Sequence, residues 1–386
     1  MEATGQTAAP ADAAPQGQGL PRPDAARHAN AFGFLRLLFA SLVIVSHFPQ
    51  LVDGNAKREL LYSLTGTVGL GGLSVDGFFL ISGYLVVSSF CNQPTVVAYL
   101  ARRLARIVPG FVLACLFCLL VVAPLAGVDY GVIAADWRQH IATTLILHEP
   151  MVPQAFAGTH YPVMNGSMWT IIHEFRCYLV VIVLGLLGAF RWRWSVPVIS
   201  ALLFLGYEVV SGHIGAPELR RAIIAAVPVN DADNALRFTG IFLVGSTFYL
   251  FRQQIALRPR VALMLAVPLV AIMTMRSVFH PGLLEPAFAV LGGYVIFTTA
   301  FCVTTGPLAR INTRTDISYG VYLYAWPVAK LLLWYWPDMP VALGIAINFA
   351  LACALGWASW HLIEKRAAGI FTRKRAAPAI AAPAKK

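Results

Sequence analysis

Residues 32–52 read FGFLRLLFASLVIVSHFPQLV, and this stretch decides the class of fold. Its length matches the roughly 20 residues that an α-helix needs to cross the hydrocarbon core of a bilayer. Only two of its side chains, Arg36 and His47, carry or can acquire a positive charge. The segment therefore predicts a transmembrane helix with two ionisable groups inside it, and such groups are functional candidates by default.

The rest of the chain repeats this apolar pattern. Of the 386 residues, 58% are hydrophobic and 12% are charged, whereas about a quarter of the residues in soluble domains are charged. The chain is therefore predicted to be an all-α, polytopic membrane protein with about ten transmembrane helices. After the first span, the other nine are expected at 68–90, 106–127, 166–189, 193–211, 235–252, 260–276, 283–303, 317–336 and 339–363.

The basic residues predict the orientation. Of the 29 Lys and Arg, three lie within the predicted spans away from their ends, nineteen lie in loops, tails or span ends on the side of the two termini, and seven lie in loops or span ends on the other side. Since cytoplasmic loops carry the positive excess, both termini are expected in the cytoplasm. The basic residues form short clusters between apolar runs, so the net charge of +11 does not indicate a nucleic-acid partner.

Two tails flank the membrane domain, which is predicted to cover residues 32–366. Residues 1–31 are rich in Ala, Pro, Gln and Gly and hold almost no large apolar side chains, so they are expected to be a disordered cytoplasmic tail. Residues 367–386 form a short basic tail, also expected in the cytoplasm.

Four ionisable residues inside the spans need an explanation: Arg36, His47, Asp76 and Glu174. Arg36 and His47 are offset by only about 20° around one helix, but are roughly 16 Å apart along it. Asp76 and Glu174 each lie about eight residues into a span that runs inward, at the expected level of His47. The pattern predicts His47 as a general base with one of these carboxylates as its orienting partner. The alternative is that the four groups only satisfy one another in the helix bundle.

Three arginines precede the third span at its cytoplasmic end. Arg102 and Arg106 are spaced i, i+4 on one helical face, with Arg103 between them. This face suits phosphate groups, but it is equally typical of a positive-inside anchor. In the longest outer loop, 128–165, the histidines lack the short spacing of a metal site, so no metal is expected.

Taken together, six segments resemble the acyltransferase-3 family of membrane acyltransferases, which modify bacterial O-antigens, exopolysaccharides and related acceptors. The resemblance runs nearly end to end. Its segments are Arg36-x10-His47, GLSVDGFFLISG at 72–83, RRLARIVP at 102–109, GSMWTIIHEF at 166–175, ISYGVYLY at 317–324 and LIEK at 362–365.

The resemblance implies that Arg36 and His47 are essential and that the donor is a cytoplasmic acyl-coenzyme A, with acetyl-coenzyme A expected, acting as co-substrate rather than as a bound cofactor. Four further residues of these motifs are expected to line the acceptor site or pocket: Ser82, Trp169, Tyr319 and Tyr322. Many members have a histidine in the ninth span where this chain has Ala325, so a mechanism that needs that second histidine is excluded.

The sequence thus predicts an O-acyltransferase of the bacterial inner membrane that acts on a cell-surface or exported carbohydrate. Arg102, Arg103 and Arg106 would hold the donor phosphates, Arg36 would lie further in, and His47 would deprotonate the acceptor hydroxyl. The alternative is an exporter of a glycan or lipid-linked glycan, in which Arg36, His47, Asp76 and Glu174 form a proton relay.

Overall fold

The computed structural model describes residues 30–93, 95–227, 231–275, 278–313, 315–367 and 369. Every regular element of these ranges is a helix. The all-α class is therefore confirmed for this part of the chain. The predicted tails, 1–31 and 367–386, lie almost wholly outside the described residues, so the expectations about them stay predictions.

A helix occupies each of the ten predicted ranges. The main helices are α2 (Phe32–Asp53), α4 (Leu70–Cys91), α5 (Val96–Phe117), α9 (Thr170–Leu186), α10 (Ser195–Val210), α12 (Ala232–Leu250), α13 (Pro259–Thr274), α15 (Gly293–Cys302), α16 (Ser318–Tyr335) and α17 (Val341–Ser359). Shorter elements join them: η1 (Ala56–Arg58), α3 (Leu60–Thr65), η2 (Cys118–Val122), α6 (Ala123–Leu125), α7 (Tyr130–Ala135), α8 (Trp137–Leu145), α11 (Pro217–Ala226), η3 (Pro281–Leu283), α14 (Leu284–Ala287), η4 (Phe288–Gly292), η5 (Leu308–Arg310) and η6 (Trp360–Glu364).

Five helical segments of the described residues are long and apolar enough to cross a membrane: Phe32–Asp53, Leu70–Cys91, Val96–Leu125, Leu284–Cys302 and Val341–Ala367. Large apolar side chains such as Leu120, Leu202 and Leu263 are exposed on the outside of the helix bundle, at 53%, 60% and 73%. Exposed apolar area on this scale suits contact with lipid. The chain is therefore a multi-pass membrane protein.

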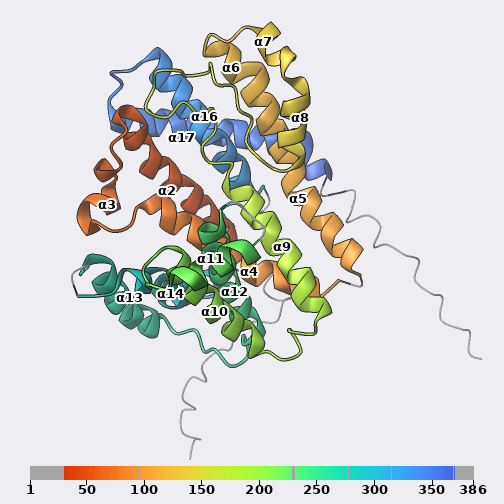
Figure 1. Ribbon diagram of the computed structural model, residues 1–386, viewed down its shortest axis with the longest axis vertical. Helices are drawn as coiled ribbons and strands as arrows, with labels where there is room; N and C mark the ends of the chain where they lie inside the picture. The colour runs from red at the N-terminus through yellow and green to blue at the C-terminus, as the bar shows by residue number, and fades with distance from the viewer. Residues whose placement is uncertain are drawn as a thin grey trace, which may run out of the picture.

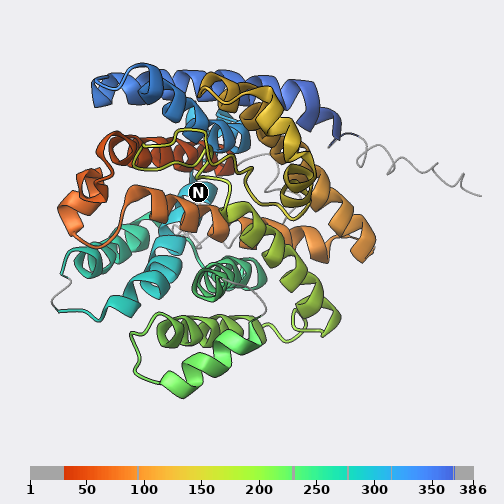
Figure 2. The same cartoon turned by 45° about the horizontal axis from the view of Figure 1, so that its top comes forward.

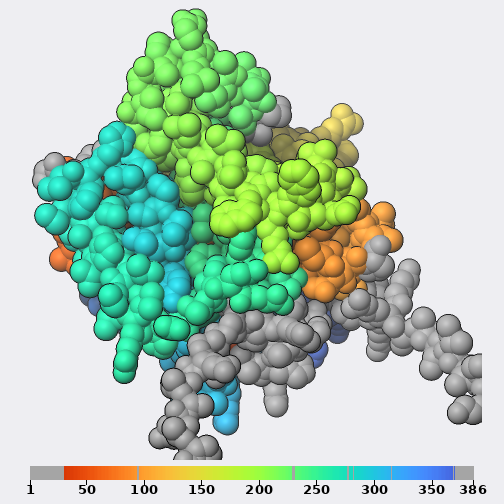
Figure 3. All heavy atoms as spheres, turned by 90° about the horizontal axis from the view of Figure 1, so that it is seen from below, coloured from red at the N-terminus to blue at the C-terminus, as the bar shows by residue number. Residues whose placement is uncertain are grey.

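The helices pack in a row that can be followed in Figures 1 and 2, with α17 against α16, α16 against α2, α2 against α4, α4 against α12 and α12 against α10. Seen from below, most of the visible surface belongs to the green and cyan segments of α10 to α15 (Figure 3). At the contact of α4 with α12, a Cβ on Gly83 would lie 1.9 Å from the carbonyl oxygen of Phe242. Small residues let these two backbones approach closely, as in other membrane helix pairs.

The third span differs from its prediction because its helix begins ten residues earlier, at Val96. The hydroxyl of Thr95 caps this end by accepting a hydrogen bond from the amide of Ala98, at 3.1 Å. Arginine favours helix as strongly as leucine does, so the basic segment continues the apolar helix instead of preceding it. Arg102, Arg103 and Arg106 therefore project from a rigid element.

Candidate active site

One cavity in the described part of the chain gathers most of the predicted site residues. It lies among α2, α4, α5, α9 and α16 and has a volume of about 110 Å³. Seven predicted residues from these helices line it: Arg36, Ser82, Arg103, Arg106, Glu174, Tyr319 and Tyr322. Arg36 and Tyr322 lie 286 positions apart in the sequence, yet both line this cavity.

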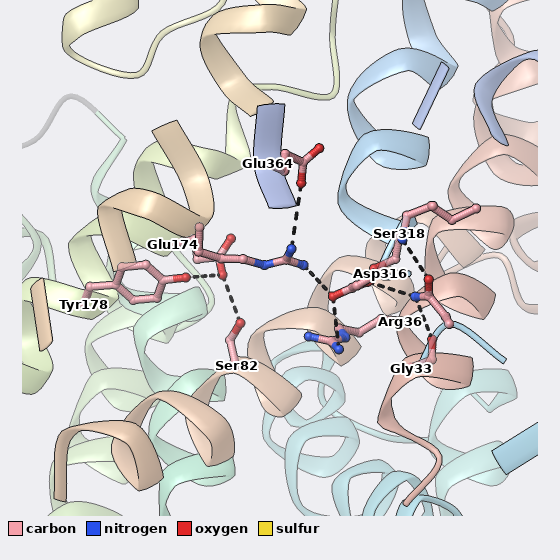
Figure 4. Close-up of polar contacts among 11 residues, drawn as sticks. Gly33, Arg36, Ser82, Glu174, Tyr178, Asp316, Ser318 and Glu364 are labelled. Carbon is pink, nitrogen blue, oxygen red and sulfur yellow. Dashed lines mark hydrogen bonds and ion pairs between the residues drawn. The ribbon is translucent and has the colours of Figure 1, made fainter. Parts of the chain in front are cut away.

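Two arginines of this cavity share one carboxylate (Figure 4). The guanidinium of Arg36 lies 3.1 Å from Oδ2 of Asp316, and that of Arg106 lies 2.6 Å from the same oxygen. Each guanidinium has five N–H donors, and a single carboxylate oxygen does not occupy them all. An anion in the cavity would therefore find charge-assisted donors already in place.

Asp316 is fixed by neutral donors as well as by the arginines. Its Oδ1 accepts hydrogen bonds from Asn312, at 2.8 Å, and from the hydroxyl of Ser318, at 2.6 Å. Burial alone would raise the pKa of Asp316, but the charges of Arg106 and Arg36 and these two hydrogen bonds together hold that pKa below its ordinary value. The carboxylate therefore stays ionised and keeps both guanidinium groups in position.

Arg106 is held from a second side by the C-terminal end of the bundle. The carboxylate of Glu364 lies 3.8 Å from Arg106 and accepts a hydrogen bond from Ser359, at 2.7 Å (Figure 4). Glu364 ends the π-helical turn η6, a kind of local distortion that is frequent at functional sites. The ring of Tyr319 lies 5.7 Å from the Arg106 guanidinium carbon, within the range of a cation–π contact.

Glu174 forms the opposite, acidic wall of the cavity. Its Oε1 accepts hydrogen bonds from the hydroxyls of Ser82, at 3.0 Å, and Tyr178, at 2.7 Å (Figure 4). The expectation that this carboxylate orients His47 is wrong in this structure, because Glu174 is bonded to α4 and to its own helix instead. On α9, Glu174 faces the cavity that Arg36 and Arg106 also line.

Asp76 has a different partner from the one expected. Both of its carboxylate oxygens lie 2.6 Å from the Arg237 guanidinium, and Glu285 lies 3.8 Å from the other side of Arg237. Asp76 is 2% exposed and does not belong to the cavity lining. The predicted contact of Asp76 with His47 is therefore wrong as well. A buried carboxylate takes the strongest donor within reach, and α12 supplies that donor.

His47 lies outside the cavity, near the other end of α2. Its Nδ1 is 3.5 Å from the side-chain oxygen of Gln50, one helical turn further on. The indole of Trp326 packs edge-on against the imidazole, with the ring centres 5.2 Å apart. Arg36 and His47 thus belong to two separate surroundings on one helix, as their spacing predicts.

Two other predicted residues, Arg102 and Trp169, are not among the residues that line the cavity. Trp169 immediately precedes α9 and packs against His173, with ring centres 5.7 Å apart, and against Phe238. Arg102 lies on α5 one residue before Arg103. The described residues hold no group of three or more His, Cys, Asp or Glu arranged to bind a metal ion.

The sequence reasoning missed three charged residues that decide these contacts: Asp316, Glu364 and Arg237. Asp316 directly precedes the ISYGVYLY motif, and Glu364 lies within LIEK. Neither carboxylate was assigned a role from the sequence. Arg237 was counted with the outer loops, although it lies two residues inside the predicted sixth span. A charge search that extended to the ends of every span would have found all three.

The chain is similar in sequence to known acyltransferases over most of its length. A family model described as an acyltransferase domain matches residues 30–361. An "O-acetyl transferase" of Shigella phage Sf6 is 26% identical over 352 residues, which cover 87% of this chain and 95% of that protein. The "Nodulation protein 10" of Rhizobium leguminosarum bv. viciae is 24% identical over 382 residues, covering 88% of this chain and 93% of that protein. No solved structure gives a significant match.

Proposed function

Because the chain belongs to the acyltransferase-3 family, we propose that this acyltransferase moves an acetyl group from acetyl-coenzyme A to a hydroxyl of a cell-surface or exported carbohydrate. The proposal places it in the bacterial inner membrane, with ten spans and both termini in the cytoplasm. The name of the phage relative, an O-acetyl transferase, supports the choice of acetyl and of oxygen as the atom acylated.

The observation that carries the proposal is the cavity lined by Arg36, Arg103 and Arg106. The Nε atoms of Arg36 and Arg103 are buried and have no hydrogen-bond partner among the described residues, so the protein alone does not satisfy either guanidinium. Planar guanidinium groups suit phosphates because they donate two parallel hydrogen bonds. In this proposal the phosphates of the coenzyme bind at the inner end, and the pantetheine arm extends along α2 toward His47.

His47 is then the general base of the transfer. Its Nε2 takes the proton of the acceptor hydroxyl while that oxygen attacks the thioester carbonyl. The new C–O bond forms, the C–S bond breaks, and the coenzyme leaves as a thiolate that recovers the proton. The roughly 16 Å rise between Arg36 and His47 separates the phosphates from the chemistry and keeps the acceptor on the outer side.

A deletion strain complemented with wild type or His47→Ala tests this function. Mass spectrometry of its surface glycans should show one missing acetyl mass, restored by wild type alone. Ser41→Ala is the matched control on the same helix, because the Ser41 hydroxyl only bonds the carbonyl of Leu37. Full acetylation with His47→Ala at normal expression would contradict the proposal. Glycan transport by vesicles without consumption of thioester would favour the exporter instead.

A further inference from the structure

A hydrogen-bonded chain leads away from His47 to the outer end of its helix. Nδ1 of His47 lies 3.5 Å from Oε1 of Gln50, and Nε2 of Gln50 donates to the Tyr161 hydroxyl at 2.6 Å. The Tyr161 hydroxyl in turn lies 3.5 Å from the carbonyl oxygen of Gly54, which ends α2. Two side chains, those of Gln50 and Tyr161, thus connect the imidazole to the main chain.

The last member of this chain fixes the direction of every bond in it. A backbone carbonyl can only accept, so the Tyr161 hydroxyl donates to Gly54. The same hydroxyl oxygen then accepts from the amide nitrogen of Gln50, which turns the amide oxygen toward His47. An amide oxygen only accepts, so Nδ1 of His47 is the protonated nitrogen and Nε2 carries the lone pair.

The loop that carries Tyr161 is held in place along α16. The ammonium of Lys330 donates to the Thr159 hydroxyl at 2.7 Å, and the indole nitrogen of Trp326 donates to the carbonyl of Val163 at 3.2 Å. Trp326 also packs edge-on against both Tyr161 and the imidazole, at 6.2 Å and 5.2 Å. Tyr161 therefore meets Gln50 from a fixed position, which is what an orienting group requires.

Gly71, at the start of α4, lies beside Nε2 of the His47 imidazole. A Cβ on Gly71 would lie 3.4 Å from Nε2 of His47 and 2.9 Å from the hydroxyl oxygen of Ser46. A Cβ on the next residue, Gly72, would meet no atom within 4 Å. Nδ1 of His47 thus faces Gln50, and Nε2 faces the start of α4.

From this arrangement, and resting on the proposed function, we infer that Gln50 and Tyr161 are positioning residues. They hold His47 in the tautomer whose Nε2 accepts the proton of the acceptor hydroxyl. The role that the sequence assigned to Asp76 or Glu174 thereby passes to a neutral amide and a phenol.

Kinetics of purified protein in lipid vesicles test the inference with Gln50→Leu, Gln50→Glu and Tyr161→Phe. We expect Gln50→Leu to lower kcat about tenfold, less than the loss of a general base would cost, with unchanged KM for acetyl-coenzyme A. A carboxylate also accepts from Nδ1, so Gln50→Glu should restore most of kcat. Gln50→Leu that keeps wild-type kcat, or Gln50→Glu that is no better than Gln50→Leu, would overturn the inference.

A second measurement does not depend on activity. In protein labelled with 15N at histidine, the His47 signals, identified by their loss in His47→Gln, should show a protonated Nδ1 and an unprotonated Nε2. Gln50→Leu should shift them toward a mixture of tautomers. The opposite tautomer in wild type would overturn the inference even if His47→Ala is inactive, whereas an active His47→Ala would remove the proposed function itself.

Tyr335→Phe is the matched control for Tyr161→Phe, because the Tyr335 hydroxyl also donates to a backbone carbonyl, that of Leu125, at 2.6 Å. It lies at the end of α16 and has no bond to the Gln50 chain. We expect Tyr161→Phe to lower kcat about threefold, because the amide of Gln50 then loses the neutral hydroxyl that orients it, and Tyr335→Phe to leave kcat unchanged. Equal effects of the two variants would show that loss of a tyrosine hydroxyl alone explains the result.

Discussion

The two ends of α2 differ in how their ionisable group is held. At the N-terminal end, the inner end in the proposed orientation, Arg36 shares the carboxylate of Asp316 with Arg106, at 3.1 Å and 2.6 Å. At the C-terminal end, the outer end in the proposed orientation, the imidazole of His47 has one long polar contact, 3.5 Å to the neutral Gln50. Ion pairs fix a charge permanently, whereas a neutral partner leaves an imidazole able to gain and lose a proton. In the proposed mechanism, one end of the helix binds charge and the other exchanges a proton.

The largest effect should come from removing the imidazole at the outer end. We expect His47→Gln to lower kcat by about 10²- to 10⁴-fold, the usual contribution of a general base. KM for acetyl-coenzyme A should not change, because in the proposed mechanism the donor phosphates bind at the inner end. Steady-state kinetics in vesicles measure both constants. A raised KM with normal kcat would mean that His47 contributes to donor binding and not to proton transfer.

A second variant tests the buried ion pair of Asp76 on α4 with Arg237 on α12, which lies at neither end of α2. We expect this pair to stabilise the packing of the two helices and to have no part in the reaction. Asp76→Ala leaves Arg237 without its 2.6 Å partner, and breaking such a pair costs about 3–5 kcal/mol. The midpoint of thermal unfolding in detergent should therefore fall strongly. The double variant Asp76→Leu with Arg237→Met should recover much of the loss, because an apolar pair can replace a buried ion pair. If the double variant is stable but has no activity, Asp76 has the catalytic role that the sequence predicted.

The inner end should respond through donor binding. Arg36→Lys keeps the charge but loses the planar fork that binds phosphate, so KM for acetyl-coenzyme A should rise about tenfold while kcat stays near wild type. Arg252→Lys is the matched control, because Arg252 packs over the ring of Tyr249 at 4.2 Å and does not line the cavity. A fall in kcat alone in Arg36→Lys would place this arginine at the chemistry rather than at the phosphates.

The comparison also shows what the sequence could and could not predict. Length and hydropathy are local properties, so the helices were found within a few residues, except where α5 starts at Val96. Helical spacing placed Arg36 and His47 in separate surroundings, because both lie on one rigid element. The partners of Asp76 and Glu174 come from other helices, and their choice depends on how each helix is rotated, which spacing within one helix does not reveal. The predicted carboxylate partner of His47 was wrong for this reason.

The smallest effect should come from the indole that supports the outer end. Trp326→Phe keeps an aromatic edge near His47 but loses the 3.2 Å bond to the Val163 carbonyl. One neutral hydrogen bond contributes about 0.5–1.5 kcal/mol, so kcat should fall about two- to tenfold with unchanged KM. Trp192→Phe is the control, since Trp192 is 81% exposed. A loss as large as that of His47→Gln would mean that the indole, and not only the imidazole, takes part in the transfer.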